Sequence, residues 1–83
     1  MSLLLLMINT KKMHREFAMQ RRNAIVRSEI DWQLTFEQWQ QIWLKSGKYS
    51  LRGCYADEYQ MYRINNSGSY SVGNVVIRSG KSK

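Results

Sequence analysis

Residues 59–77, YQMYRINNSGSYSVGNVVI, decide the fold of this chain. They contain two runs rich in β-branched and aromatic residues, 59–64 and 75–77, separated by the polar, glycine-rich segment 65–74. Such runs predict strands, and the Asn, Ser and Gly residues between them are typical of turns. Asn tolerates positive φ, and Gly68 and Gly73 can adopt it because glycine has no Cβ atom to clash. We therefore expect two antiparallel strands joined by a long loop. An isolated hairpin is marginally stable in water, so the rest of the chain has to supply the surface on which it packs.

Length and charge bound what the chain can be. Its 83 residues make one domain, and 43% hydrophobic residues are enough for a compact core. The formal net charge of +7 favours a polyanionic partner, nucleic acid before membrane, although a basic surface can also simply aid solubility. No stretch reaches the roughly 20 apolar residues of a transmembrane helix, so no membrane partner is expected.

Cysteine and histidine usage points to a chain without a metal or cofactor. Cys54 is the only cysteine and His14 the only histidine, so there is neither a disulfide framework nor a zinc-binding spacing. This usage fits a reducing compartment, and we expect the cytoplasm.

Residues 1–9, MSLLLLMIN, are the most apolar part of the chain. They lack the basic start and the cleavage site of a signal peptide. A run this apolar seldom stays exposed, so it either covers a groove of its own domain or forms a contact in a homodimer. Alternatively, its first residues are a cloning remnant and the native start lies at an internal methionine such as Met7.

Residues 10–29 predict a first helix, with Thr10 as its N-cap. Met13, Phe17 and Ala24 fall on one narrow apolar stripe. Glu16 is the only acidic residue between positions 10 and 28, so few i,i+4 ion pairs are available to the many cations. An ordinary solvated helix face is the alternative, but we expect phosphate contacts from four residues: Lys11, Lys12, Arg15 and Arg22.

Residues 36–46 predict a second helix from its local chemistry. Thr35 and Gln38 fit a capping box, and Gly47 is expected just beyond the last turn. Trp39 and Trp43 recur at helical spacing, and we interpret them as core anchors rather than as platforms for stacked bases.

The connection 46–57 and the hairpin provide a second group of predicted phosphate contacts. Basic residues interleaved with aromatic ones suit contact with nucleic acid, although an ordinary surface loop has the same composition. This group is Lys48, Arg52, Arg63 and Arg78. Within the hairpin loop, residues 65–69, with Asn65 and Asn66, and Tyr70 are candidates for contacts in a DNA groove.

The hairpin also resembles a known family. Residues 62–66, YRINN, followed by a polar loop and by GNV at 73–75, are similar to the H-H-I-D-G…E-N-L pattern of HNH endonucleases. Small phage-borne relatives of that family are more similar still, because in them a W-x-x-x-W helix precedes S-G, R-G, Y-x-M-x-R, G-x-Y and G-N-V. These elements stand here at Trp39/Trp43, Ser46-Gly47, Arg52-Gly53, Tyr59/Met61/Arg63, Gly68/Tyr70 and Gly73-Asn74-Val75. The likeness covers residues 34–77.

The resemblance implies a strand–loop–strand unit in which Asn74 pins the loop. Tyr62 and Arg63 stand where the family has the histidines that bind metal and act as general base. Six residues after Ile77 leave no room for the family's metal-binding helix. The likeness therefore implies the recognition half of a nuclease without catalytic or metal-binding residues.

Together these features predict an α+β domain over residues 10–78, with two helices packed on a small antiparallel sheet and a basic tail at 79–83. The predicted function is non-catalytic binding of nucleic acid, double-stranded DNA in particular, in a phage or mobile-element setting in the host cytoplasm. A small factor that binds or inhibits a host protein is the alternative, favoured by the many aromatic residues. An active nuclease with an unrecognised site is a third hypothesis.

Overall fold

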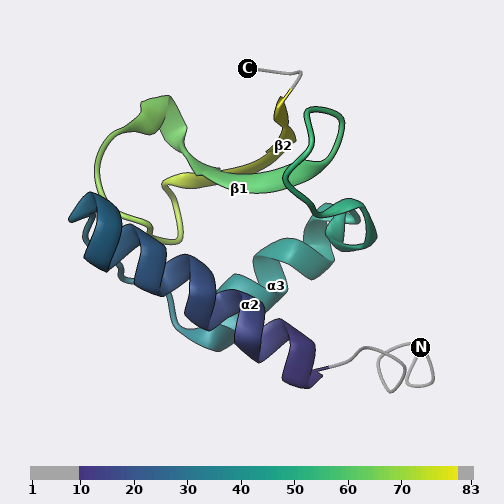
Figure 1. The fold of residues 1–83 in the computed structure, drawn as a ribbon, viewed down its shortest axis with the longest axis horizontal. Helices are drawn as coiled ribbons and strands as arrows, with labels where there is room; N and C mark the ends of the chain where they lie inside the picture. Colours follow the sequence, from purple (N-terminus) through teal and green to yellow (C-terminus); the bar gives the residue numbers. More distant parts are fainter. Residues whose placement is uncertain (1–9, 81–83) are drawn as a thin grey trace.

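The computed structural model describes residues 10–80 and has an α+β fold, in which two helices lie on one side of a two-stranded antiparallel sheet (Figure 1). The helices are α2 (Thr10–Arg22), which continues into the π-helical turn Asn23–Arg27, and α3 (Phe36–Ser46). The strands are β1 (Tyr59–Arg63) and β2 (Val75–Ser79), and short 3₁₀ turns occupy Tyr49–Leu51 and Ile64–Asn66. The predicted fold class is confirmed. The predictions for residues 1–9 and for the last tail residues, 81–83, lie outside the described part of the chain.

The first helix forms where its apolar stripe predicts, with differences at both ends. Met13 and Ala24 are buried and Phe17 packs against the core. Thr10 is helical rather than the residue before the helix, so its prediction as N-cap is wrong. At the other end, Ile30 N–H donates to Ala24 O at 2.9 Å and Glu29 takes a φ of 55°. The helical segment therefore ends at Arg27, two residues earlier than predicted, and Glu29 takes the left-handed conformation that usually favours glycine.

The second helix has the predicted bounds because its ends are determined locally. The Thr35 hydroxyl accepts from Gln38 N–H at 3.1 Å, and Gln38 Oε1 accepts from Thr35 N–H at 3.0 Å. Gly47 follows the helix at φ 70° and donates to Leu44 O. The capping box and the C-terminal glycine are confirmed.

The core lies between the helices and the sheet. Its fully buried side chains are Met13, Trp39 and Trp43, joined by Leu34 and Met61. Gln20 links the layers, since its Oε1 accepts from Trp39 Nε1 at 2.9 Å and its Nε2 donates to Met61 O at 3.4 Å. The interpretation of both tryptophans as core anchors is confirmed.

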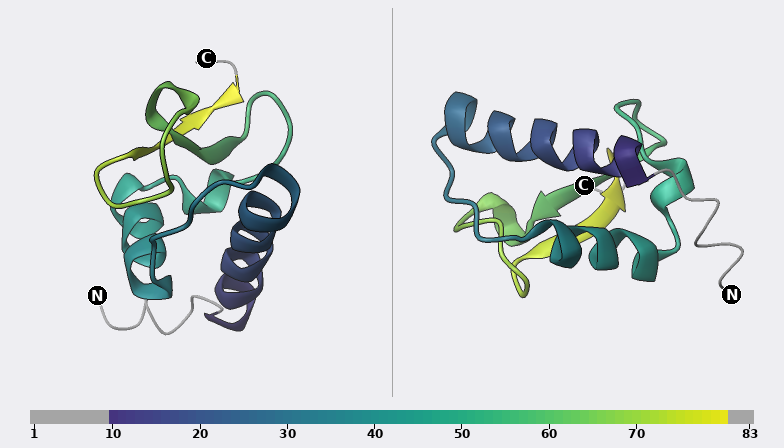
Figure 2. Two further views of the ribbon diagram at one scale, coloured as in Figure 1. Left: turned by 90° about the vertical axis from the view of Figure 1, so that its left-hand side faces the viewer. Right: turned by 90° about the horizontal axis from the view of Figure 1, so that it is seen from below.

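The sheet pairs Tyr59 with Ser79 and Arg63 with Val75. Met61, Val75 and Ile77 pack against the core, and the alternation of side chains places Tyr62, Val76 and Arg78 on the other face. No described helix covers that outer face (Figure 2). β2 runs to Ser79, one residue into the segment predicted as the basic tail.

The loop between the strands has most of the expected turn geometry. Asn65, Asn66 and Gly68 have φ values of 57°, 53° and 78°. Gly73 lies outside the left-handed region, so that prediction is wrong. It occupies a turn closed by the hydrogen bond from Asn74 N–H to Ser71 O at 2.9 Å, and this turn does not place Gly73 at positive φ.

Candidate nucleic-acid interface

Lys11, Arg15 and Arg22 lie on the side of α2 that is turned away from the core, and all three are exposed. We call these three residues the basic face. They extend along roughly 16 Å of helix at about 1.5 Å per residue, the length of about five base-pair steps. None of them forms an ion pair with a residue in the range 10–80. Their charge is therefore available to an anionic partner.

The only acid within α2 is turned inward and neutralised there. Glu16 Oε2 lies 3.1 Å from Arg52 Nη1 and 3.7 Å from Lys12 Nζ, and Glu16 Oε1 accepts a short hydrogen bond from the Tyr49 hydroxyl. Burial, together with this hydrogen bond to Glu16, raises the pKa of Tyr49 to about 12. Glu16 thus does not compensate the basic face.

Arg52 has a structural position that the sequence did not reveal. Its guanidinium carbon lies 5.7 Å from the Trp39 ring and 5.4 Å from the Trp43 ring, and its side chain is only 25% exposed. Arg52 is thus held between Glu16 and two buried indoles. The structure therefore gives Arg52 a place beside the core, and its role as a phosphate contact stays a prediction.

Two predicted lysines rest on tyrosine rings. Lys12 Nζ lies 5.6 Å from the centre of the Tyr49 ring and Lys48 Nζ lies 5.2 Å from that of Tyr59. These cation–π contacts orient the side chains and leave their positive charges in place.

The remaining predicted residues lie along the hairpin. Four of them, together with Ile64, Val75 and Val76, line an open groove of about 620 Å³: Arg63, Asn65, Asn66 and Arg78. The Arg78 guanidinium lies 4.3 Å from the Tyr62 ring. No residue of α2 lines this groove, so the structure divides the predicted phosphate contacts between two separate surfaces.

Tyr70 packs against the connection between the two helices. Its ring lies 4.9 Å from that of Trp32, its N–H donates to Asp31 O, and its carbonyl accepts from Gln33 N–H. These contacts dock the hairpin loop on the connection between the helices. Tyr70 thus has a packing role in the fold, and its contact with a DNA groove stays a prediction.

Asn74 holds the hairpin loop together. Its Nδ2 donates to Ser67 O and to Ser69 O, both at 2.8 Å. Arg63 Nη1 adds a hydrogen bond to Gly68 O at 2.6 Å. The loop-pinning role that the resemblance implied for Asn74 is the role it has here.

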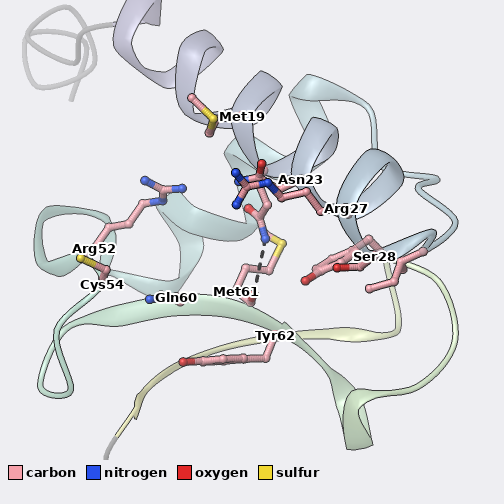
Figure 3. A pocket seen from close by; sticks show the side chains of 14 residues that line it. Met19, Asn23, Arg27, Ser28, Arg52, Cys54, Gln60, Met61 and Tyr62 are labelled. Carbon is pink, nitrogen blue, oxygen red and sulfur yellow. Dashed lines mark hydrogen bonds between the residues drawn. The ribbon is translucent and has the colours of Figure 1, made fainter.

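A cleft between α2 and β1 contains residues that sequence reasoning missed (Figure 3). Its volume is about 580 Å³, and its polar lining residues include Asn23 and Arg27 at the end of the helix, Arg52, and Gln60 on β1. No local signal marks these residues, because they come from segments far apart in the chain. A smaller hollow of about 260 Å³, lined by Met19, Arg22, Asn23, Val26 and Arg27, adjoins the cleft.

The described residues contain no group of three or more His, Cys, Asp or Glu side chains that could hold a metal ion. Within the same residues, no helix has the length and apolar character needed to cross a membrane. No protein-family model, curated protein or solved structure matches the chain.

Proposed function

We propose that this chain binds nucleic acid, duplex DNA in particular, through phosphate contacts made by the basic face of α2. The observation that carries the proposal is the exposure of Lys11, Arg15 and Arg22 on one side of a helix whose only acid, Glu16, is neutralised inside the protein. Cations that lack an acidic neighbour attract phosphates and release the counterions bound to them. The net charge of +7 adds long-range attraction to the same partner.

The proposal includes binding without cleavage. The resemblance to HNH endonucleases supports DNA as the partner and a phage or mobile element as the setting. Tyr62 and Arg63 occupy the places of the histidines, which supports the absence of hydrolysis, since hydrolysis needs an activated water and a neutralised phosphate. Supercoiled plasmid incubated with the protein and Mg²⁺ or Mn²⁺ is expected to stay intact. Nicking that a point mutation abolishes would overturn this part of the proposal.

The binding itself is tested by the double charge reversal Arg15→Glu and Arg22→Glu. Fluorescence anisotropy with a labelled 20-base-pair duplex is expected to show a roughly hundredfold or greater loss of affinity at low salt. Lys45→Glu, at an exposed position in the last turn of α3, is the control and should change affinity far less. Circular dichroism verifies that each variant is folded. Unchanged affinity in the folded double variant would remove α2 from the interface.

A protein partner is the second candidate function, and exposed apolar side chains favour it. Met19 and Val26 are 61% and 67% exposed and line the same hollow as Arg22 and Arg27. Apolar residues bordered by arginine are typical of protein interfaces. Salt separates the two functions, because DNA bound through several phosphates loses orders of magnitude in affinity between 50 and 200 mM salt. An apolar protein contact weakens much less over that range.

A further inference from the structure

The cleft between α2 and β1 carries polar groups that the fold itself does not use. Asn23, Arg27, Ser28 and Gln60 line it, and none of their side chains forms a hydrogen bond or ion pair within residues 10–80. None of the lining side chains is acidic, and of the two arginines Arg27 has no ion pair within residues 10–80, whereas Arg52 is paired with Glu16. Unused donors and acceptors without a carboxylate suit a ligand that combines negative charge with a hydrogen-bonding edge.

The walls of the cleft are held in place by the core. Gln20, at its base, has both ends of its amide engaged, by Trp39 and by the backbone of Met61. Arg52 is held by Glu16, and its Nε is buried without a hydrogen-bond partner among the described residues. Met61 and Ala24 provide an apolar floor that is 3% and 6% exposed. The floor of the cleft is therefore preformed, which lowers the cost of ordering it when a ligand binds.

The cleft is connected to the basic face of α2. Met19, Asn23 and Arg27 line both the cleft and the adjoining hollow, and Arg22 belongs to both the hollow and the basic face. A phosphate backbone that follows the basic face therefore passes over the hollow and reaches the mouth of the cleft. No acidic side chain lines this path through the hollow and the cleft.

The size of the cleft selects what can enter. A volume of about 580 Å³ is typical of sites for small ligands, which range from roughly 300 to 1,000 Å³. A base-paired duplex is too wide for it, whereas one unstacked nucleotide is of suitable size. Arg27 lines the cleft as a cation for the phosphate, and the amide of Asn23 can pair with the edge of a base, while Gln60 lines the rim formed by β1.

We propose that the cleft binds an unpaired nucleotide, so that the protein recognises DNA where a duplex meets a single strand. This inference rests on the proposed function, since the basic face holds the duplex while the cleft takes the first unpaired residue.

The test compares a blunt 20-base-pair duplex with the same duplex carrying a three-nucleotide overhang, by anisotropy under identical salt. The overhang is expected to raise affinity about tenfold, which is the gain expected from binding one unpaired base. If neither DNA binds, the proposed function itself fails. If both bind equally, the proposed function stands and the cleft inference is overturned.

Arg27→Gln and Arg21→Gln form a matched pair, because each removes one exposed arginine from the same helical segment and only Arg27 lines the cleft. Both are expected to weaken binding of the blunt duplex slightly. Only Arg27→Gln should abolish the preference for the overhang. A second variant of the cleft is Gln60→Glu. If Arg27→Gln and Gln60→Glu both still bind the overhang duplex more tightly than the blunt duplex, the overhang binds elsewhere and the inference is overturned.

Cys54 provides an independent readout. It is the only cysteine of the chain, is exposed and lies at the cleft. The rate of thiol modification by 5,5′-dithiobis(2-nitrobenzoate) should fall at saturating overhang DNA and stay unchanged at saturating blunt DNA. Equal rates with the two DNAs would show that the overhang does not occupy the cleft.

Discussion

Arg15 and Arg52 belong to the same residue type, and both were predicted to contact phosphate, yet the molecule uses them differently. Arg15 is exposed on the basic face of α2 and forms no ion pair with a described residue. Arg52 lies against Trp39 and Trp43 with its charge opposite Glu16. The number of cationic residues therefore overestimates the positive charge that is available to a binding partner. What matters is which cations the acidic residues and the aromatic core have already engaged.

The largest expected effect comes from the buried member of this comparison. Arg52→Met should lower the free energy of unfolding by about 3 kcal/mol, because it leaves the half-buried Glu16 carboxylate without its closest cation. Urea denaturation measures the change. Arg15→Met is the control and should shift stability by less than about 0.5 kcal/mol. If both variants lose the same free energy of unfolding, Arg52 does not stabilise the protein more than Arg15 does.

Tyr49→Phe tests the cluster of Glu16, Tyr49 and Arg52 by removing the hydroxyl group through which Tyr49 donates to Glu16. At neutral pH the lost hydrogen bond to Glu16 should cost about 1 kcal/mol. Because the folded-state pKa is about 12 and the unfolded value is near 10, the folded protein keeps a proton that the unfolded chain loses. The stabilisation from Tyr49 is therefore complete below pH 10 and is lost as the pH rises from 10 to 12.

The measurement for this prediction is the slope of stability against pH in the alkaline range. Tyr49→Phe should flatten that slope, whereas Tyr55→Phe, at a side chain 74% exposed, should leave it as in the unaltered protein. An unchanged slope in Tyr49→Phe would mean that the Tyr49 hydroxyl is not coupled to the fold.

The smallest stability effect, and the clearest binding effect, is expected on the basic face. Arg15→Gln should change stability by less than about 0.5 kcal/mol, since the side chain is exposed and unpaired among residues 10–80. It should lower the slope of log K against log salt by about one for the duplex, as expected for one lost phosphate contact. Lys45→Gln should leave the slope unchanged. The same slope in all three proteins would place DNA away from Arg15.

The second helix and the hairpin were predictable because the interactions that define them are local. The capping box joins residues three apart, Thr35 and Gln38, and Gly47 ends the helix within its own last turn. The hairpin follows from two runs of strand-forming residues around Asn and Gly residues, three of which take positive φ. Misjudged details such as Gly73 and Glu29 concern backbone angles that depend on how a turn is closed, and composition alone does not specify this.

The candidate site was predictable only in part. Exposure of the basic face follows from helical periodicity, because Lys11, Arg15 and Arg22 lie opposite the apolar stripe. The ion pair of Arg52 with Glu16 does not follow from periodicity, because the two residues lie 36 positions apart in the chain. The docking of Tyr70 on Trp32 and the cleft between Arg27 and Gln60 are likewise formed by distant segments.

The sequence by itself thus determined the class of fold, the ends of α3, the hairpin and the excess of positive charge, because each arises from composition or from contacts between near neighbours. Tertiary structure alone decided which arginine is free and which stabilises the core, and where a cleft opens between α2 and β1. The physical reason is that burial and ion pairing depend on which distant side chains packing brings together, and one hydrophobic pattern is compatible with many such pairings.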